Sequence, residues 1–178
     1  MFDIYTHLKN RYMNFKNHDV WINPTEQMAV FPLWNLSGQM VGYQNYRPLN
    51  PKEPNNDPKS GRYYTHRNKE HISIWGLESW NFSRTLFVCE GIFDACRLTN
   101  HSVSAIALLS NNPTDATKRW LWTVRQFRPV FSICDSGNSG KKLASLSHES
   151  HTMQVNDLGD SSEEFVLDII RKYSDGNF

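Results

Sequence analysis

Short apolar runs alternate with helix-like segments along the C-terminal half of the chain. Residues 85–89, 103–109 and 129–134 are predominantly apolar, which is the pattern of strands buried on both faces of a parallel sheet. A fourth strand is expected at 153–155. Because parallel strands need crossover connections, usually helices, the sequence predicts an α/β fold with a mainly parallel sheet flanked by helices. Helices are expected over residues 91–100, 113–127, 141–148 and 163–173.

The helix expected over residues 113–127 has the clearest internal signals. Asn112 is the expected N-cap and Pro113 the first helical residue, a position where proline is well tolerated. Apolar residues at helical spacing are expected to face the core. They are Ala116, Trp120, Val124 and Phe127.

The N-terminal half has a different pattern. Residues 28–34 and 40–46 are strand-like runs joined by a turn that contains Ser37 and Gly38, which predicts an antiparallel hairpin. Pro32 places the first of these strands at a sheet edge or beside a bulge, because proline cannot donate to a ladder. Residues 1–20 are read as a short helix with a basic face or as a poorly ordered lead-in, the latter being preferred for the first few residues. We therefore expect a small mixed α+β lobe over 1–84 and an α/β domain over 85–178.

Composition narrows the possible functions. The 178 residues suffice for one good core or two small lobes, and the net charge of +1 means that any nucleic-acid surface must be local. Cys89, Cys96 and Cys134 occur singly in apolar segments, so we expect reduced, buried thiols and no zinc site. No apolar stretch approaches the ~20 residues that a membrane span needs. These features predict a soluble, cytoplasmic protein with no membrane partner.

Acidic residues follow several of the predicted strands. Glu90 comes directly after the first buried strand and Asp135 directly after the third. Parallel strands share their carboxyl ends, so both acids are expected at the same edge of the sheet, where α/β folds place their ligands. Asp157 and Asp160 follow the fourth strand, and Asp160 is the preferred member of that pair. Such a group suits Mg²⁺ or Mn²⁺, although Glu90 alone could also be a general acid or base, or an ordinary loop carboxylate.

The motif around Glu90 resembles a known family. Residues 88–94 form a strand followed by Glu-Gly-x-x-Asp, which is similar to the first motif of the Toprim domain in bacterial and phage DnaG-type primases. The family's Asp-x-Asp-x-Ala-Gly motif falls at residues 135–140, at a similar separation. The order of further motifs, over roughly residues 28–170, makes the match fairly specific. They are Phe31-Pro32-Leu33, residues 37–43, Arg47, Arg62-Tyr63-Tyr64 and Ile74-Trp75-Gly76-Leu77.

The chain also departs from the family pattern. Gly137 stands where the second aspartate of Asp-x-Asp is expected, and the adjacent Asn138 offers only a neutral oxygen. Residues 110–112 replace the usual Gly-Thr, and residues 160–163 stand in place of the late Asp-Pro-Asp motif. We expect a catalytic core without a zinc-binding or helicase domain.

The resemblance implies roles for the basic residues. In a primase-like protein the basic and aromatic stretch 62–69 is a candidate for binding single-stranded nucleic acid, with a solvated strand as the alternative. Lys141 and Lys142 follow a glycine-containing turn and are candidates for holding a nucleoside triphosphate, or simply an exposed helix face. The proposed nucleic-acid contacts are Arg47, Arg62, Tyr63, Arg67 and Lys69.

The function that the resemblance implies is DNA-templated synthesis of short RNA primers by metal-dependent nucleotidyl transfer in DNA replication. Its partners would be single-stranded DNA, nucleoside triphosphates and a replicative helicase or a separate zinc-module protein, in the bacterial cytoplasm if the chain is encoded by a phage or another mobile element. One alternative is a catalytically decayed module that binds single-stranded DNA or a replication partner, because Gly137 removes one expected ligand. Another is a Toprim nuclease that uses the same acids.

Overall fold

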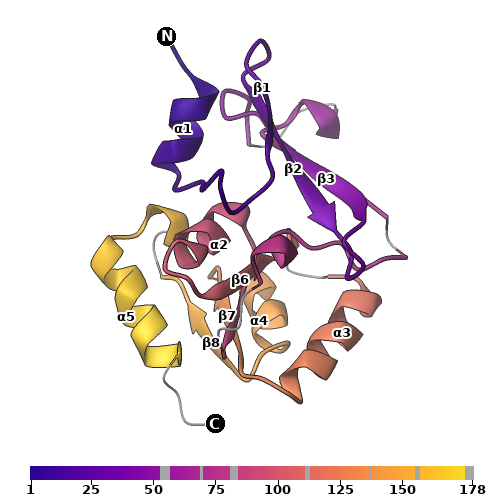
Figure 1. The fold of residues 1–178 in the computed structure, drawn as a ribbon, viewed down its shortest axis with the longest axis vertical. Coiled ribbons are helices and arrows are strands. Elements are labelled where there is room, and N and C mark those ends of the chain that lie inside the picture. The colour runs from indigo at the N-terminus through magenta and orange to yellow at the C-terminus, as the bar shows by residue number, and fades with distance from the viewer. Residues whose placement is uncertain are drawn as a thin grey trace.

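Two four-stranded sheets, one antiparallel and one parallel, organise the molecule. The structure is a computed structural model. In Figure 1 the antiparallel sheet lies above the parallel one, with α5 and α3 on opposite sides of the latter. The structure describes residues 1–52, 57–68, 70–80, 84–110, 113–136, 138–154 and 157–174.

The antiparallel sheet has the strand order β1-β2-β3-β4 and contains the expected hairpin. The Asn35 carboxamide oxygen accepts hydrogen bonds from the amides of Ser37 and Gln39, which closes the turn between β2 and β3. Pro32 lies beyond the part of β2 that pairs with β1, and a bulge follows it. The missing amide hydrogen therefore breaks no pairing with β1. The strands are β1 (Trp21–Asn23), β2 (Met28–Trp34), β3 (Met40–Tyr46) and β4 (Tyr63–Arg67).

The second sheet confirms the expected α/β architecture. Its strands run parallel in the order β6-β5-β7-β8, and β5, β6 and β7 are buried throughout. The strands are β5 (Leu86–Cys89), β6 (Ser104–Ala107), β7 (Val130–Cys134) and β8 (Glu149–Thr152). The helices that alternate with them are α2 (Ile92–Thr99), α3 (Asp115–Arg125), α4 (Asn138–Ala144) and α5 (Glu163–Ser174).

Several expected boundaries were wrong. The fourth strand is β8 at 149–152 rather than 153–155, because it is a largely exposed edge strand of polar residues that carries no apolar signal. Helix α4 begins earlier than expected and ends before His148. Helix α3 begins at Asp115, with Thr114 as its N-cap, so Pro113 precedes the helix. Asn112 lies outside the described residues. Phe127 follows the helix and is 84% exposed, so it is not a core residue.

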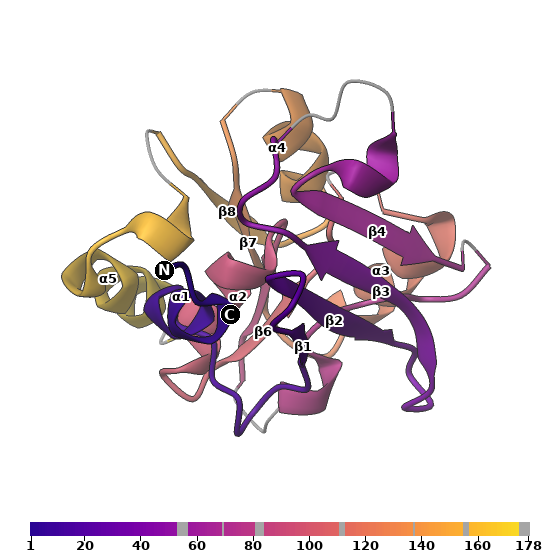
Figure 2. The same cartoon turned by 90° about the horizontal axis from the view of Figure 1, so that it is seen from above.

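The N-terminal residues are not a poorly ordered lead-in, because helix α1 (Ile4–Asn10) is part of the core. Asp3 caps this helix by accepting a hydrogen bond from the amide of Thr6. Ile4 and Leu8 are fully buried in the main hydrophobic cluster. Helix α1 lies above α2 in Figure 1 and in front of it in the view from above (Figure 2). Two apolar residues one turn apart were too weak a signal to distinguish this helix from a mobile end.

The segment at residues 74–75 joins the two sheets. Ile74 pairs with Trp34 at the end of β2, and Trp75 pairs with Ala107 at the end of β6. Both Ile74 and Trp75 are fully buried. One chain segment thus hydrogen-bonds to both sheets and fixes their relative position. No helix within the described ranges has the length and apolar character needed to cross a membrane.

Candidate active site

A cavity of about 260 Å³ opens at the carboxyl ends of β5 and β7. Its walls come from both sheets and carry opposite charges. Glu90, Asp94, Asp135 and Asp157 line it from the parallel sheet and its connections, whereas Arg11, Gln44, Lys52 and Tyr63 come from the N-terminal half.

The two strand-end acids are brought together by the register of the sheet. Strands β5 and β7 are parallel neighbours, and Cys89 pairs with Ile133. Each strand therefore ends at the same edge, and the next side chains to leave the two strands there are Glu90 and Asp135. The sequence-based expectation that these acids share one edge follows directly from this topology.

Glu90 has a buried carboxylate oxygen, Oε2, that faces no donor in the described part of the chain. Burial raises the pKa of Glu90, and the negative charges of Asp135 and Asp157 raise it further. A carboxylate oxygen that is withdrawn from water and lacks a donor is costly. A bound cation would satisfy this oxygen.

Asp135 and Asp157 complete the acidic side of the cavity. Asp135 lies at the exposed rim of the cavity. Partial burial raises its pKa, and the negative charge of Asp157 raises it further, whereas the positive charge of Lys52 lowers it. Asp157 lies directly before the short helix η3 (Leu158–Asp160). The structure thus brings Asp157, rather than the preferred Asp160, into the cavity. Asp160 lies beside Arg11, with 3.5 Å between its Oδ1 and Nη1 of Arg11, and its role as a metal ligand stays a prediction.

Asp94 is a site residue to which the sequence reasoning gave no role. It lies in the first turn of α2, and its Oδ1 accepts a hydrogen bond of 2.8 Å from the amide of Gly159. Burial raises its pKa to about 7. A Cβ on Gly91 would lie 2.8 Å from Asp94 Oδ2, so the glycine makes room for this carboxylate. The Glu-Gly-x-x-Asp spacing was the signal that could have identified it.

The positive wall was also missed. Lys52 belongs to the proline-rich loop after β3, and Arg11 follows α1. The Arg11 guanidinium lies over the ring of Phe93, 4.5 Å from its centroid. Neither residue lies in a recognisable local motif. Their proximity to the acids arises only when the two sheets come together.

Of the predicted nucleic-acid contacts, Tyr63 lines this cavity. Its ring stacks on that of Tyr46 with 5.1 Å between centroids, and burial raises its pKa to about 12. Arg47 and Arg62 brace the loop beside it, donating to the carbonyl oxygens of Lys59 and Asn50 respectively. These three residues stay predictions as nucleic-acid contacts.

The remaining predicted residues lie elsewhere. Arg67 donates from both terminal nitrogens to the carbonyl oxygens of Leu108 and Leu109, which ties β4 to the parallel sheet. Lys141 and Lys142 are exposed on α4 and do not line the cavity. Lys69 and Gly137 lie outside the described residues, as does the side chain of Asn138.

The donor set fits a hard divalent cation. Within the described ranges, no three His, Cys, Asp or Glu side chains form a preassembled metal cage. Mg²⁺ does not require one, because it keeps several waters and is commonly bound by one or two carboxylates together with substrate phosphates. Glu90 offers a carboxylate oxygen that has no hydrogen-bond partner in the described residues, and Asp135 and Asp157 are close enough to raise its pKa. These carboxylates could therefore supply the one or two protein ligands that Mg²⁺ needs.

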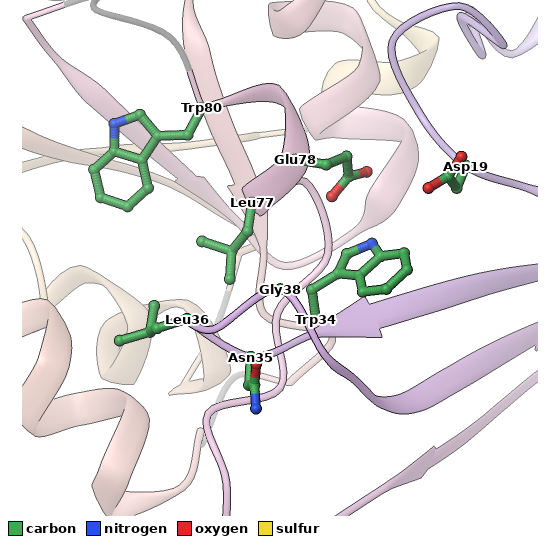
Figure 3. Close-up of a pocket in the computed structure, with 8 residues that line it drawn as sticks. All are labelled: Asp19, Trp34, Asn35, Leu36, Gly38, Leu77, Glu78 and Trp80. Atoms are coloured by element: carbon green, nitrogen blue, oxygen red, sulfur yellow. The ribbon is translucent and has the colours of Figure 1, made fainter.

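A different cavity, of about 410 Å³, lies on another part of the surface (Figure 3). Trp34, Leu36, Leu77 and Trp80 provide its apolar walls. The charged residues among those lining it are Asp19 and Glu78, and Glu78 Oε1 lies 3.0 Å from Nδ1 of His18. Two carboxylates and an apolar lining disfavour a phosphate-bearing ligand, so this cavity is not the candidate active site.

Comparisons with known proteins identify the fold. No family model matches the sequence, and no curated protein is similar to it in sequence. The structure is similar to that of the Aquifex aeolicus primase zinc-binding and RNA polymerase domains, with a TM-score of 0.58 and 18% identity over 89% of this chain and 43% of that one. The RNA polymerase domain of Mycobacterium tuberculosis primase DnaG, in complex with double-stranded DNA, gives a TM-score of 0.60 at 14% identity over 94% and 63% of the two chains.

A DnaG primase catalytic domain bound to single-stranded DNA is also similar, with a TM-score of 0.56 and 16% identity over 94% of this chain and 58% of that one. These identities are low, so the likeness shows the fold alone, and this fold is similar to that of the catalytic domains of DnaG-type primases. This confirms the resemblance inferred from the sequence motifs. The chain spans 43–63% of the length of these structures.

Proposed function

We propose that the chain is a primase-like nucleotidyltransferase that synthesises short RNA primers on single-stranded DNA. The observation that carries this proposal is the cavity between the sheets, where the strand-end acids Glu90 and Asp135 face Lys52 and Arg11. Two features support it: the fold of DnaG-type primase cores and the order of the sequence motifs. One of those cores was solved bound to single-stranded DNA, which supports such DNA as the template here.

In this proposal the two walls of the cavity have separate tasks. Glu90, Asp135 and Asp157 would hold Mg²⁺ or Mn²⁺, which stabilises the charge that develops on phosphate oxygens during nucleotidyl transfer. Lys52 and Arg11 would attract and orient the triphosphate of the incoming nucleotide from the opposite wall. Tyr63 offers an aromatic face for a base at the same opening. Lys141 and Lys142, which are exposed on α4 and do not line the cavity, remain candidate triphosphate contacts.

A primer-synthesis assay tests the proposal. Purified protein, single-stranded DNA, ribonucleotides and Mg²⁺ or Mn²⁺ should yield short RNA, and Glu90→Gln or Asp135→Asn should abolish it. Each change removes a negative charge while nearly preserving shape. Asp168→Asn is the matched control, because Asp168 is an exposed acid on α5 paired with Arg171. Its activity should equal that of the wild type.

The alternatives give different results in the same assay. Gly137 stands where an acid is expected, which is the observation in favour of a module that has lost its catalytic activity. Such a module would bind the template but make no product with Mg²⁺ or Mn²⁺. Gly137→Asp should then restore synthesis if a lost ligand is the cause. Metal-dependent cleavage of the template, without synthesis, would instead support a Toprim nuclease and refute the primase proposal.

A further inference from the structure

The apolar cavity shown in Figure 3 is separate from the candidate active site, and we name it the Trp34 cavity. The two cavities share no lining residue in the described structure. Trp75 pairs with Ala107 in the antiparallel sense, so the chain that follows runs back along β6 toward its amino end as the short helix η2 (Leu77–Ser79). The active site lies at the opposite, carboxyl edge of the parallel sheet. An occupant of the Trp34 cavity would therefore leave the acidic site open.

Local structure sets the walls of the Trp34 cavity. The carboxamide of Asn35 closes the turn between β2 and β3, which fixes Leu36 at the tip of the hairpin. Gly76 has a φ of 91°, and a Cβ there would lie 2.8 Å from the carbonyl oxygen of Ala105, so a side chain would push η2 away from β6. The volume of about 410 Å³ lies within the ~300–1,000 Å³ typical of ligand pockets. The cavity is therefore a formed pocket.

The apolar side of the cavity extends onto the surface. Leu36 lines the cavity together with Leu77 and Trp80, yet it is 54% exposed. Met40 pairs with Trp34 across the hairpin and is 45% exposed. Apolar residues that gather at one place on a surface mark interaction sites, whereas scattered ones need no explanation. An occupant that reaches beyond the cavity would cover more of this surface than one confined to it.

Two polar groups of the cavity have no partner in the described part of the chain. In Figure 3 the carboxylates of Asp19 and Glu78 lie on the same side of the view as the indole nitrogen of Trp34. Trp34 Nε1 is buried and donates to no acceptor there. Glu78 is held by His18, whereas no described group pairs with the carboxylate of Asp19. A buried donor without an acceptor is costly, so a ligand that supplies one gains affinity.

These groups define the chemistry of the occupant. The carboxylate of Asp19, near that of Glu78, attracts a cation and repels a nucleic acid. The indole N–H of Trp34 requires an oxygen, and the apolar side accepts an aliphatic or aromatic group. A protein segment with an arginine or lysine between apolar residues supplies all three, because its backbone carbonyl groups provide the oxygen.

We propose that the Trp34 cavity is a docking site for a segment of a partner protein in which an arginine or lysine is flanked by apolar residues. The cationic side chain would pair with Asp19, and a backbone carbonyl oxygen would accept from Trp34 Nε1. The apolar side chains would pack against Leu36 and Leu77. This docking site does not depend on the proposed primer synthesis.

Synthetic peptides test the proposal on the full chain. The probe is an acetylated and amidated Gly-Leu-Arg-Leu-Gly peptide, and Gly-Leu-Gln-Leu-Gly is its uncharged counterpart. Nuclear magnetic resonance of ¹⁵N-labelled protein follows the indole N–H signals, which single Trp→Phe variants assign. We expect the arginine peptide to shift the signals of Trp34 and Trp80. The signals of the exposed Trp21 and Trp122, on β1 and α3, should not move.

Asp19→Asn tests the charge preference. This change should raise the Kd of the arginine peptide about twofold to fivefold, as expected for one exposed ion pair, and leave that of the glutamine peptide unchanged. Glu26→Gln is the matched control, because Glu26 is an exposed acid at the other end of β2 from Trp34. It should bind both peptides like the wild type.

Leu36→Ser tests the apolar side of the cavity. It should weaken both peptides by the same factor of about five, which corresponds to roughly 40 Å² of covered apolar surface. Amide spectra that match the wild type outside the cavity would show that the variants keep the fold. Both Asp19 and Leu36 are exposed, so neither substitution opens a hole in the core.

Several results would overturn the docking site. One is the absence of shifts at Trp34 and Trp80 with ~1 mM arginine peptide. Another is equal affinity for the two peptides, or a preference for arginine that survives Asp19→Asn. Binding of N-acetylarginine amide as tightly as the peptide would assign the cavity to a small cation. The same shifts on concentrating the protein alone would assign it to a second copy of the chain. None of these results bears on primer synthesis, which its own assay decides.

Discussion

Asp94 shows how the acidic cavity affects the stability of the fold at the scale of one residue. Burial raises its pKa from 3.8 to about 7, so the native state keeps this proton while the unfolded chain releases it. Between about pH 4 and pH 7 the native state therefore binds more protons, and the free energy of unfolding must fall as the pH rises. The slope from this residue is at most ~1.4 kcal/mol per pH unit.

Asp94→Asn tests this linkage. Asparagine keeps an oxygen that can accept from the Gly159 amide but carries no charge. We expect the variant to match wild type near about pH 4 and to be more stable near about pH 8, where the burial penalty is complete. Urea unfolding at the two pH values measures the difference. Asp168→Asn, at an exposed site, should show no such divergence, and a parallel shift of both variants would contradict the assignment to Asp94.

The metal binding proposed at Glu90 and Asp135 should respond to pH for the same physical reason. Burial first, and then neighbouring carboxylates, raise the pKa of both groups, so a divalent ion must compete with protons. We expect the affinity for Mn²⁺ to rise with pH through a range above that of ordinary carboxyl groups, with proton release detectable by calorimetry in buffers of different ionisation enthalpy. In Glu90→Gln the release should decrease. An affinity independent of pH would contradict binding at these acids.

Residue-level prediction from the sequence succeeded where local structure decides position. Glu90 and Asp135 each follow a short buried strand, and the parallel pairing of those strands sets them side by side. Prediction was less successful beyond β7, the last buried strand. Strand β8 is polar, so the sequence did not show where it ends or which acid follows it at the edge of the sheet. Asp157 and Asp160 are only three residues apart, so this uncertainty was enough to favour the one that lies outside the cavity.

At the scale of single elements, α1 is the clearest difference between sequence and structure. Its length of 7 residues is too short to be stable alone, and its buried Ile4 and Leu8 pack it against the core. Leu8→Ala should therefore lower the free energy of unfolding by about 2–5 kcal/mol, as for other fully buried leucines.

The control for this helix is Asn10→Ala, because Asn10 is an exposed residue at the end of α1. Its effect should stay within about 0.5 kcal/mol, as for ordinary surface substitutions. Denaturant titration of the three proteins supplies the comparison. If Leu8→Ala were equally neutral, α1 would not be a stabilising part of the fold in solution.

At the scale of the whole molecule, the positive and negative walls of the candidate site come from different halves of the chain. Arg11 and Lys52 precede the acids by tens of residues, and no periodicity in the sequence relates them. Their proximity depends on residues 74–75, which pair with both sheets, and on the hydrogen bonds from Arg67 to the carbonyl oxygens of Leu108 and Leu109 after β6. A fold class can be inferred from local patterns, but a site shared by two sheets requires long-range packing that those patterns do not encode.

Phe93 lies at the centre of this packing. It belongs to α2 of the parallel half, yet its ring contacts Phe31 and Tyr46 of the antiparallel sheet edge-on, at centroid distances of 6.1 and 5.1 Å. The three residues share one hydrophobic cluster with α1. Such a continuous core predicts that the two sheets unfold together rather than as separate units.

Phe93→Ala provides the test of that coupling. Phe93 is only 5% exposed, so the substitution should reduce the free energy of unfolding by about 3–5 kcal/mol. Because the cavity would open between the sheets, hydrogen exchange should accelerate to a similar extent in β3 and in β5, although only β5 belongs to the mutated half. Faster exchange confined to the parallel sheet would show that the halves are energetically independent, and the opposing walls of the site would then be held together only weakly.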